Sequence, residues 1–418
     1  MILQKKLKIL ISAYACSPYH GSEPGMGWNF ILGLSKYHEI HVITEKLKWK
    51  SNIERYFNGN PPKNLNFYFI EKRRNKKFRK IWPPSYYFYY RLWQKEAYNL
   101  GKALNLEHNF DIIHQLNMVG YREPGYLWEI DKPFVWGPIG GLENTPWRYL
   151  PTLGFQGLVH YLGRNIYNLF QRNFSLRVRR AIRRSNSSII AATPGNKNLI
   201  KQIWDIDSHL ICEVGNVADK AELNLNFRLE LNEPFRIIWS GQHIPGKNLP
   251  LLLNAVKNLS FDFELHILGD GIMQQKWQKI AKKFSIEEKC KWHGWLNRDI
   301  AISVMHKGHV LCITSLCDLT STITLEALSV GLPIICLDHL GFSEVVNEKC
   351  GIKIPLESPI SCTSKISNAL ELLEKDEMYR RKLSIGAFKR SQEYDWDSKI
   401  KKINKIYFEL LKRVHDTK

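Results

Sequence analysis

Short apolar runs alternate with longer amphipathic segments along most of the chain. An apolar run at residues 7–13 precedes a glycine-containing loop, an amphipathic segment at about 28–36 and a second apolar run at 40–44. Short apolar runs bounded by turn residues are typical of buried strands, and longer segments with a helical period are typical of helices. The order strand, loop, helix, strand predicts a βαβ unit with parallel strands.

The same alternation continues through the first half of the chain and starts again after a polar stretch at 215–234. Further apolar runs lie at 66–70, 111–114, 134–136, 188–192, 235–240, 264–268, 309–314 and 333–337. We therefore expect an α/β fold of two Rossmann-like, doubly wound domains that face each other across a central cleft. The expected domains are residues 1–217 and 218–395, and a last helix at 396–418 is expected to pack back on the first domain.

Composition adds a strong charge imbalance to this picture. The 418 residues include 60 Lys and Arg against 40 Asp and Glu, a net charge of +20. This excess favours an anionic partner, either nucleic acid, anionic lipid or a phosphorylated small molecule. The eight cysteines form no C-x-x-C pair, which predicts reduced, buried thiols and a cytoplasmic protein.

The N-terminus imitates a secretory signal because a basic start precedes a short apolar run. Lys8, Ser12 and Tyr14 interrupt that run, so we interpret it as a buried first strand. No stretch of the sequence has the length of a transmembrane helix, so any membrane contact is expected to be peripheral.

The most informative segment lies at 314–338 and reads TSLCDLTSTITLEALSVGLPIICLD. A predicted strand ends there, a Ser/Thr-rich loop follows, and the amides at the next helix start can bind phosphate oxygens. Seven residues separate Asp318 from Glu326. This segment resembles the E-x7-E region of retaining glycosyltransferases of family 4 (glycosyl transferases group 1), which have the GT-B architecture. Without that resemblance, the two acids could equally be a helix cap and a surface charge.

The resemblance implies roles for the residues of this segment. Glu326 corresponds to the acid that accepts hydrogen bonds from the donor ribose, and Asp318 to the acid that contacts the donor sugar. The family usually has Glu at the first position, so Asp318 is one methylene shorter. Donor contacts are further implied for the loop residues Leu319, Thr320, Ser321 and Thr322.

A second segment, SGQHIPGKN at 240–248, resembles the strand-to-helix loop of the family, including Gly241. Lys247 matches the lysine that neutralises the donor diphosphate, where a fixed cation favours the transition state. Gln242 stands where the family usually has Arg. His243 and Arg298 are the candidates for a replacement cation.

Two shorter segments, LHILGDG and WHGWL, resemble strand ends that lie near the nucleobase in the family. They add Gly269, Asp270 and His293 to the expected donor site. The alternative is that Gly269 is only a turn residue and His293 only a loop residue.

Glycine-rich segments in the first half resemble the side of the site that meets the acceptor or the sugar. Gly21 and Gly25 lie in GSEPGMGW, and Gly140 and Gly141 lie in WGPIGG. The first segment also imitates a dinucleotide fingerprint, the mark of an oxidoreductase. Phe30 occupies the third glycine position, which disfavours that alternative.

His114 matches the first histidine of the D-x-x-H-x-H strand end of the family, and Leu116 fills the second histidine position. His114 is therefore a candidate on the acceptor or sugar side, or a structural residue. No His/Cys group has zinc spacing, and the resemblance implies neither a metal nor another cofactor.

The family resemblance implies a retaining hexosyltransferase that uses a nucleoside-diphosphate sugar and a glycan or lipid-linked acceptor, in the synthesis of cell-surface polysaccharide or lipopolysaccharide. A catalytically weak nucleotide-sugar-binding protein is the alternative. Basic and aromatic residues gather at 72–93 and 155–184, which predicts docking on the anionic inner face of the plasma membrane. Nucleic acid is the rival partner and is not expected.

Overall fold

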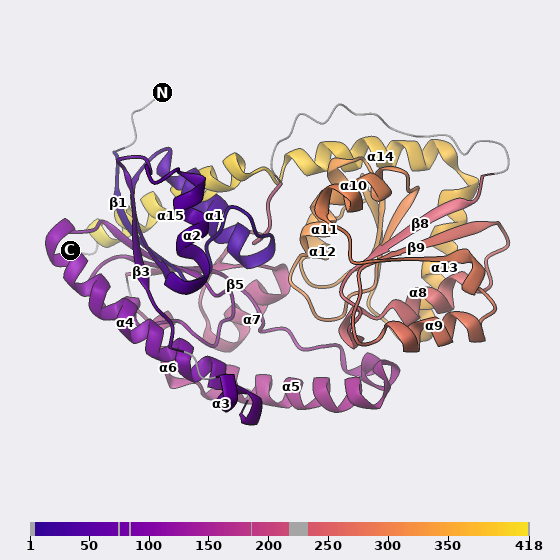
Figure 1. Ribbon diagram of the computed structural model, residues 1–418, viewed down its shortest axis with the longest axis horizontal. Helices are drawn as coiled ribbons and strands as arrows, with labels where there is room; N and C mark the ends of the chain where they lie inside the picture. The colour runs from indigo at the N-terminus through magenta and orange to yellow at the C-terminus, as the bar shows by residue number, and fades with distance from the viewer. Residues whose placement is uncertain (1–4, 74–75, 83–84, 185, 217–232, 417–418) are drawn as a thin grey trace. The chain divides into compact units, whose positions relative to one another are not determined.

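The computed structural model describes residues 5–73, 76–82, 85–184, 186–216 and 233–416. The chain forms two compact units, which we call the first and the second unit. The first unit contains Met1–Leu142, Phe170–Glu213 and Trp396–Lys418, and the second contains Glu143–Leu169 and Val214–Asp395. Figure 1 shows a parallel sheet with its helices in each unit.

The first unit is built on a seven-stranded parallel sheet with the order β3-β2-β1-β4-β5-β6-β7. Its strands are β1 (Lys8–Ala13), β2 (Glu39–Glu45), β3 (Leu65–Ile70), β4 (Ile112–Asn117), β5 (Phe134–Ile139), β6 (Ser187–Ala191) and β7 (His209–Leu210). Its helices are α1 (Ser22–Ser35), α2 (Lys46–Tyr56), α3 (Lys76–Ile81), α4 (Ser85–His108), α6 (Leu176–Ile182), α7 (Pro194–Trp204) and α15 (Trp396–Asp416).

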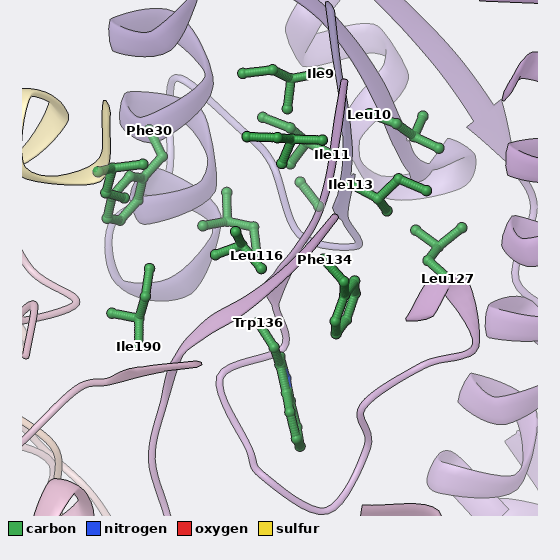
Figure 2. Packing of buried hydrophobic residues seen from close by; sticks show 14 of the residues in the cluster. Ile9, Leu10, Ile11, Phe30, Ile113, Leu116, Leu127, Phe134, Trp136 and Ile190 are labelled. Atoms are coloured by element: carbon green, nitrogen blue, oxygen red, sulfur yellow. The ribbon is translucent and has the colours of Figure 1, made fainter. Parts of the chain in front are cut away.

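The core of the first unit explains two sequence features that depart from known patterns. Figure 2 shows Phe30 of α1 and Leu116 of β4 among buried residues of the sheet, and both are almost fully buried. Phe30 packs edge-on against Trp396 of α15, with ring centroids 5.1 Å apart. A glycine at residue 30 would remove this contact between α1 and the last helix, and a histidine at residue 116 would have to be buried.

The second unit is built on a six-stranded parallel sheet with the order β10-β9-β8-β11-β12-β13. Its strands are β8 (Phe235–Ser240), β9 (Phe263–Leu268), β10 (Cys290–Gly294), β11 (Val310–Ile313), β12 (Ile334–Leu337) and β13 (Gly351–Ile354). Its helices are α8 (Leu249–Val256), α9 (Gln274–Lys283), α10 (Arg298–His306), α11 (Thr322–Ser329), α12 (Phe342–Val345), α13 (Pro359–Lys375) and α14 (Glu377–Gln392).

The predicted class of fold, two doubly wound parallel sheets, is confirmed. The apolar runs did not predict β10 and β13, the two edge strands of the second sheet, because polar residues interrupt both. An edge strand has fewer neighbours and needs less continuous apolar sequence than a central strand does.

The division into units differs from the expected boundary at one segment. Residues 143–169, expected in the first domain, group with the second unit. Tyr149, Leu150, Leu153 and Tyr161 belong to the hydrophobic core of that unit, so side-chain packing overrides position along the chain. The expected linker at 215–234 lies mostly outside the described residues. The last helix groups with the first unit.

Helix α5 (Gly154–Phe174) contains residues of both units, and its first sixteen residues belong to the second. None of the helices in the described part of the chain is both long enough and apolar enough to cross a membrane. All eight cysteines are free thiols, and seven of them are buried. Burial raises the pKa of Cys16 and Cys312, which keeps these thiols protonated and unreactive.

Candidate functional site

The candidate site of the second unit lies where the strand order of its sheet reverses, between the neighbouring strands β8 and β11. In open α/β sheets, ligands bind beyond the carboxyl ends of the strands at this point. Two loops leave those ends and are joined to each other. Leu316 N donates a hydrogen bond to Gly246 O (2.8 Å), and Thr314 Oγ1 donates one to Lys247 O (2.8 Å).

These two loops bring together the residues that the sequence placed in one site. Lys247 Nζ donates a hydrogen bond to Asp318 Oδ2 and forms an ion pair with it. The other carboxylate oxygen, Oδ1, accepts from Leu319 N (3.0 Å). The side chains of Lys247 and Asp318 are 14% and 25% exposed, so a ligand can still reach both charges.

Glu326 forms a second ion pair beside the Ser/Thr-rich loop. Arg298 Nε, at the start of α10, donates to Glu326 Oε1 on α11 (2.8 Å), and the side chain of Glu326 is 16% exposed. Arg298 was a candidate for the missing cation at Gln242, and the structure gives it a carboxylate partner instead. The second oxygen of Glu326, Oε2, has no hydrogen-bond partner among the described residues and remains available to a ligand.

The amino end of α11 lacks a side-chain cap, which several other helices in the described part of the chain have. Ser321 precedes the helix with φ 55° and makes no capping hydrogen bond, whereas Asn297 caps α10 by accepting from Ile300 N (3.0 Å). The loop is nevertheless fixed, because Gly341 N donates to Leu319 O (3.0 Å) and Thr320 is buried. Uncapped amides at a helix start suit an anion such as a phosphate.

Gln242 is exposed, and the next residue, His243, is fully buried. The imidazole of His243 lies among the rings of Trp239, Trp277 and Trp292, with centroids 5.7, 5.1 and 5.7 Å away. Burial lowers the pKa of His243. A neutral ring inside an aromatic cluster cannot replace a guanidinium, so His243 is not the missing cation.

Gly269 has a structural requirement for glycine. Its φ is 114°, and a Cβ there would lie 2.2 Å from Gly241 O. Gly241 N donates to Leu268 O (3.0 Å), and Gly269 N donates to Gly294 O (2.8 Å). These bonds join the carboxyl ends of β8, β9 and β10. Asp270 is exposed beside them, and its carbonyl accepts from His243 N (2.6 Å).

His293, at the end of β10, is engaged with another histidine. Its Nε2 lies 3.0 Å from Nδ1 of His266, and the two rings stack with centroids 5.2 Å apart. Burial lowers the pKa of His293, so the ring is neutral near pH 7. This arrangement matches the alternative in which His293 is a paired loop residue.

Tyr161 of α5 is a site neighbour that sequence reasoning missed. Cys317 Sγ lies 3.3 Å from the Tyr161 hydroxyl, and Cys317 directly precedes Asp318. A Cβ on Gly246 would lie 2.4 Å from that hydroxyl and 2.1 Å from Cys317 Sγ. Because α5 lies 156 residues before Cys317 in sequence, no local pattern could have indicated this contact.

His114, expected on the acceptor or sugar side, is a core residue of the first unit. Its Nδ1 lies 2.6 Å from the Tyr407 hydroxyl of α15, and its Nε2 lies 2.7 Å from Gly137 O. Burial lowers the pKa of His114 to about 4. The neutral ring therefore links β4 to α15 and β5, which is the structural role that the sequence left open.

The glycine-rich segments of the first unit lie beyond the carboxyl ends of β1 and β5. A Cβ on Gly25 would lie 2.4 Å from His20 O, whereas Gly21 has open space around it. Gly140 N donates to Val119 O (2.7 Å), and Gly141 has φ 83°. Steric crowding at Gly25 and the positive φ at Gly141 therefore explain, on structural grounds, why two of these four positions are glycine.

Glu23 connects these segments, a role that no sequence motif indicated. Val119 N, just beyond β4, donates to Glu23 Oε1 (2.5 Å). Burial raises the pKa of the Glu23 carboxyl. The acid at the start of α1 thereby joins the ends of β1 and β4, the point where the strand order of this sheet reverses.

Two parallel sheets of Rossmann type, one with charged loops at its switch point, define the GT-B class of α/β fold. Residues 223–390 match the family model described as "Glycosyl transferases group 1", which confirms the resemblance drawn from the motif at 314–338 for this part of the chain.

Individual relatives agree with this class. The chain is 26% identical over 161 residues, 38% of its length and 42% of the other, to "N-acetylgalactosamine-N,N'-diacetylbacillosaminyl-diphospho-undecaprenol 4-alpha-N-acetylgalactosaminyltransferase" of Campylobacter jejuni. It spans about half or less of the length of such curated relatives, 48% and 42% for two of them.

Solved structures resemble the whole chain more closely in fold than in sequence. The lipopolysaccharide outer core galactosyltransferase WaaB, in its apo form, has a TM-score of 0.65 at 14% identity, covering 96% of this chain and 99% of that one. HepE of Anabaena in complex with UDP has a TM-score of 0.61 at 14% identity, covering 96% and 100%. At such identities the similarity establishes a shared fold.

Proposed function

We propose that this protein transfers a sugar from a nucleoside-diphosphate sugar to a glycan or lipid-linked acceptor. The observation that carries the proposal is the meeting of Lys247 and Asp318 at the switch point of the second sheet. A cation, a carboxylate and an uncapped helix start in one place suit a sugar diphosphate better than they suit an uncharged ligand.

Each residue has a chemical task in this proposal. When the donor binds, Lys247 Nζ moves from Asp318 to a diphosphate oxygen, and the amides at the start of α11 bind the neighbouring oxygens. Asp318 is then free to accept a hydrogen bond from a sugar hydroxyl. Glu326 accepts hydrogen bonds from the ribose diol through Oε2, and Arg298 holds its other oxygen.

The reaction that we propose retains the anomeric configuration of a hexose and uses no metal or other cofactor. The bond from the anomeric carbon to the diphosphate oxygen breaks, the acceptor oxygen bonds to that carbon on the same face, and the leaving phosphate oxygen takes the acceptor proton. Lys247 stabilises the negative charge that grows on the diphosphate. His114 and His293 are already hydrogen-bonded to other side chains of the protein. This supports a mechanism in which no histidine acts as the base.

The comparisons support the choice of substrates. HepE, which shares the fold, is in complex with UDP, which supports a nucleoside-diphosphate donor. The name of the Campylobacter relative describes a sugar on diphospho-undecaprenol, and WaaB is described as a lipopolysaccharide galactosyltransferase. These names support a lipid-linked acceptor and a role in cell-surface polysaccharide or lipopolysaccharide synthesis.

We also propose that the protein is cytoplasmic and docks on the anionic inner face of the plasma membrane. Exposed cations and aromatics occur together at Lys77, Phe78, Arg79, Lys80 and Trp82 of α3 and the residue after it. Each cation near an anionic leaflet contributes about 1 kcal/mol.

Vesicle sedimentation tests this docking. Changing Lys77, Arg79 and Lys80 to Gln is expected to weaken binding to anionic vesicles, and salt is expected to weaken it further. Changing Lys401, Lys402 and Lys405 of α15, which are also exposed, removes the same charge elsewhere. Equal losses in both variants would contradict docking through α3.

A thermal-shift panel tests the proposed function itself. Nucleoside diphosphates and nucleotide sugars are expected to raise the unfolding temperature, and NAD or NADP is expected to leave it unchanged. Stabilisation by NAD or NADP alone would favour the oxidoreductase alternative. Binding of a nucleotide sugar without transfer to any lipid-linked or glycan acceptor would favour the catalytically weak binding protein.

A further inference from the structure

Helix α5 has two opposite faces of different character. One face is buried and contains Gly157, Tyr161, Asn165 and Asn168. The other face carries large apolar side chains that are between 38% and 81% exposed, namely Phe155, Val159, Leu162, Ile166 and Phe170. Their spacing of four, three, four and four residues places them along one side of the helix. These five residues form an apolar stripe of the kind that usually packs against a protein core, yet they are exposed to solvent.

The charge around this stripe indicates which partner would cover it. The part of the second unit that contains most of this stripe, residues 144–169, has two arginines, Arg148 and Arg164, both exposed, and no Asp or Glu. His160 and Arg164 are exposed on α5 itself. A second copy of the chain would bring the same positive charge against this surface, whereas an anionic partner is attracted to it.

We propose that α5 is a membrane-insertion helix that lies in the plane of an anionic bilayer, with the Phe155–Phe170 stripe among the acyl chains. Helices with an apolar face flanked by cations bind at this depth and respond to anionic lipid. The inference deepens the proposed function, because it names the element that brings the protein to a lipid-linked acceptor.

The buried face of the same helix packs against the donor loops of the second unit. Tyr161 contacts Cys317, the residue before Asp318. A Cβ on Gly157 would lie 2.9 Å from Cβ of Pro245, in the turn that ends at Lys247. A helix fixed at the lipid surface on one side would therefore contact the loops that carry Lys247 and Asp318 on its other side.

Vesicle binding by a triple variant tests this proposal. Changing Phe155, Val159 and Ile166 to Ser is expected to weaken partition onto vesicles of phosphatidylglycerol and phosphatidylcholine by about ten-fold or more. A matched control changes Ile272, Ile360 and Met378 of the second unit to Ser. These residues are between 78% and 81% exposed, and the control is expected to bind as the wild type does. Wild-type binding by the Phe155, Val159 and Ile166 variant would overturn the proposal.

Two further measurements make the result independent of folding and of catalysis. Hydrogen exchange of the wild-type protein is expected to slow at residues 155–170 when anionic vesicles are added, and unchanged exchange there would overturn the proposal. A change from dimer to monomer in the triple variant would also overturn it, in favour of a second copy as the occupant. Vesicle binding without any sugar transfer would contradict the proposed function and leave the role of α5 intact.

Discussion

At the residue scale, each candidate acid of the second unit is held by a cation. Lys247 pairs with Asp318, and Arg298 pairs with Glu326. These pairs are partly exposed, so each contributes little to folding stability. Their value is to keep charged side chains in place before the donor arrives, which lowers the cost of ordering them on binding.

Replacing either charged residue is expected to reduce sugar transfer strongly while the fold is retained. Lys247→Ala removes the cation at the diphosphate, and Glu326→Gln removes a ribose acceptor. Loss of one such group typically raises the activation free energy by about 3 kcal/mol, roughly a 100-fold loss of rate. Steady-state kinetics with the donor identified by thermal shift measure this loss of rate. Lys276→Ala, an exposed lysine on α9, is the control, and wild-type turnover in both test variants would contradict the site.

Gln242→Arg is expected to raise the affinity for a nucleoside diphosphate. His243 is neutral and buried, and Arg298 is held by Glu326, so neither fills the place of the guanidinium that the family usually has. An exposed residue 242 leaves room for the longer side chain. Isothermal titration calorimetry measures the change, and a marked loss of affinity would mean that another cation already occupies the position.

At the element scale, the site depends on loops that tie neighbouring strand ends together. Gly241 N, just after β8, donates to Leu268 O at the end of β9, and Gly269 N, just after β9, donates to Gly294 O at the end of β10. The carboxyl ends of β8, β9 and β10 are therefore joined to one another, and they position the loop that carries Lys247.

Gly269→Ala is expected to destabilise the second unit far more than Gly294→Ala. Both glycines have positive φ, 114° and 67°, but only a Cβ on Gly269 would collide with backbone, 2.2 Å from Gly241 O. Gly294→Ala is expected to cost about 1 kcal/mol of unfolding free energy from backbone strain alone. Urea unfolding measures both variants. Equal losses would show that the contact between the two loops is not tight.

At the scale of the whole molecule, buried neutral histidines make folding stability depend on pH. Burial lowers the pKa of His114 in the first unit to about 4, and that of His309 in the second unit to about 3. An unfolded histidine binds a proton below about pH 6.5, while the folded protein keeps these rings neutral. Stability is therefore expected to fall as the pH falls from about 6.5 towards 4.

His114→Gln is expected to flatten this pH dependence. Because one pKa unit corresponds to about 1.4 kcal/mol, His114 accounts for up to about 3 kcal/mol of the loss between pH 6.5 and 4. Urea unfolding at several pH values gives the slope of the unfolding free energy against pH. This slope, and not the absolute stability of the variant, is the quantity that tests the prediction. His415→Gln, at an exposed histidine of α15, is the control. An unchanged slope for His114→Gln would contradict the role of burial.

The sequence by itself determined the central strands of each sheet. It also determined which loop segments follow the carboxyl ends of the strands in the second sheet. Central strands such as β1, β8 and β11 are predominantly apolar, because both of their faces are buried. The motifs around Lys247, Asp318 and Glu326 follow two of these strands directly. Local order therefore already placed them beyond neighbouring carboxyl ends.

Tertiary structure alone decided which side chains meet and which groups are left neutral. The sequence could not assign Arg298 to Glu326, bury His114 against Tyr407, or bring Tyr161 to Cys317, since these partners lie between 28 and 293 residues apart. It also could not place residues 143–169 with the second core. Local patterns report whether a residue is buried and in which element, whereas the identity of its neighbours depends on how distant elements pack.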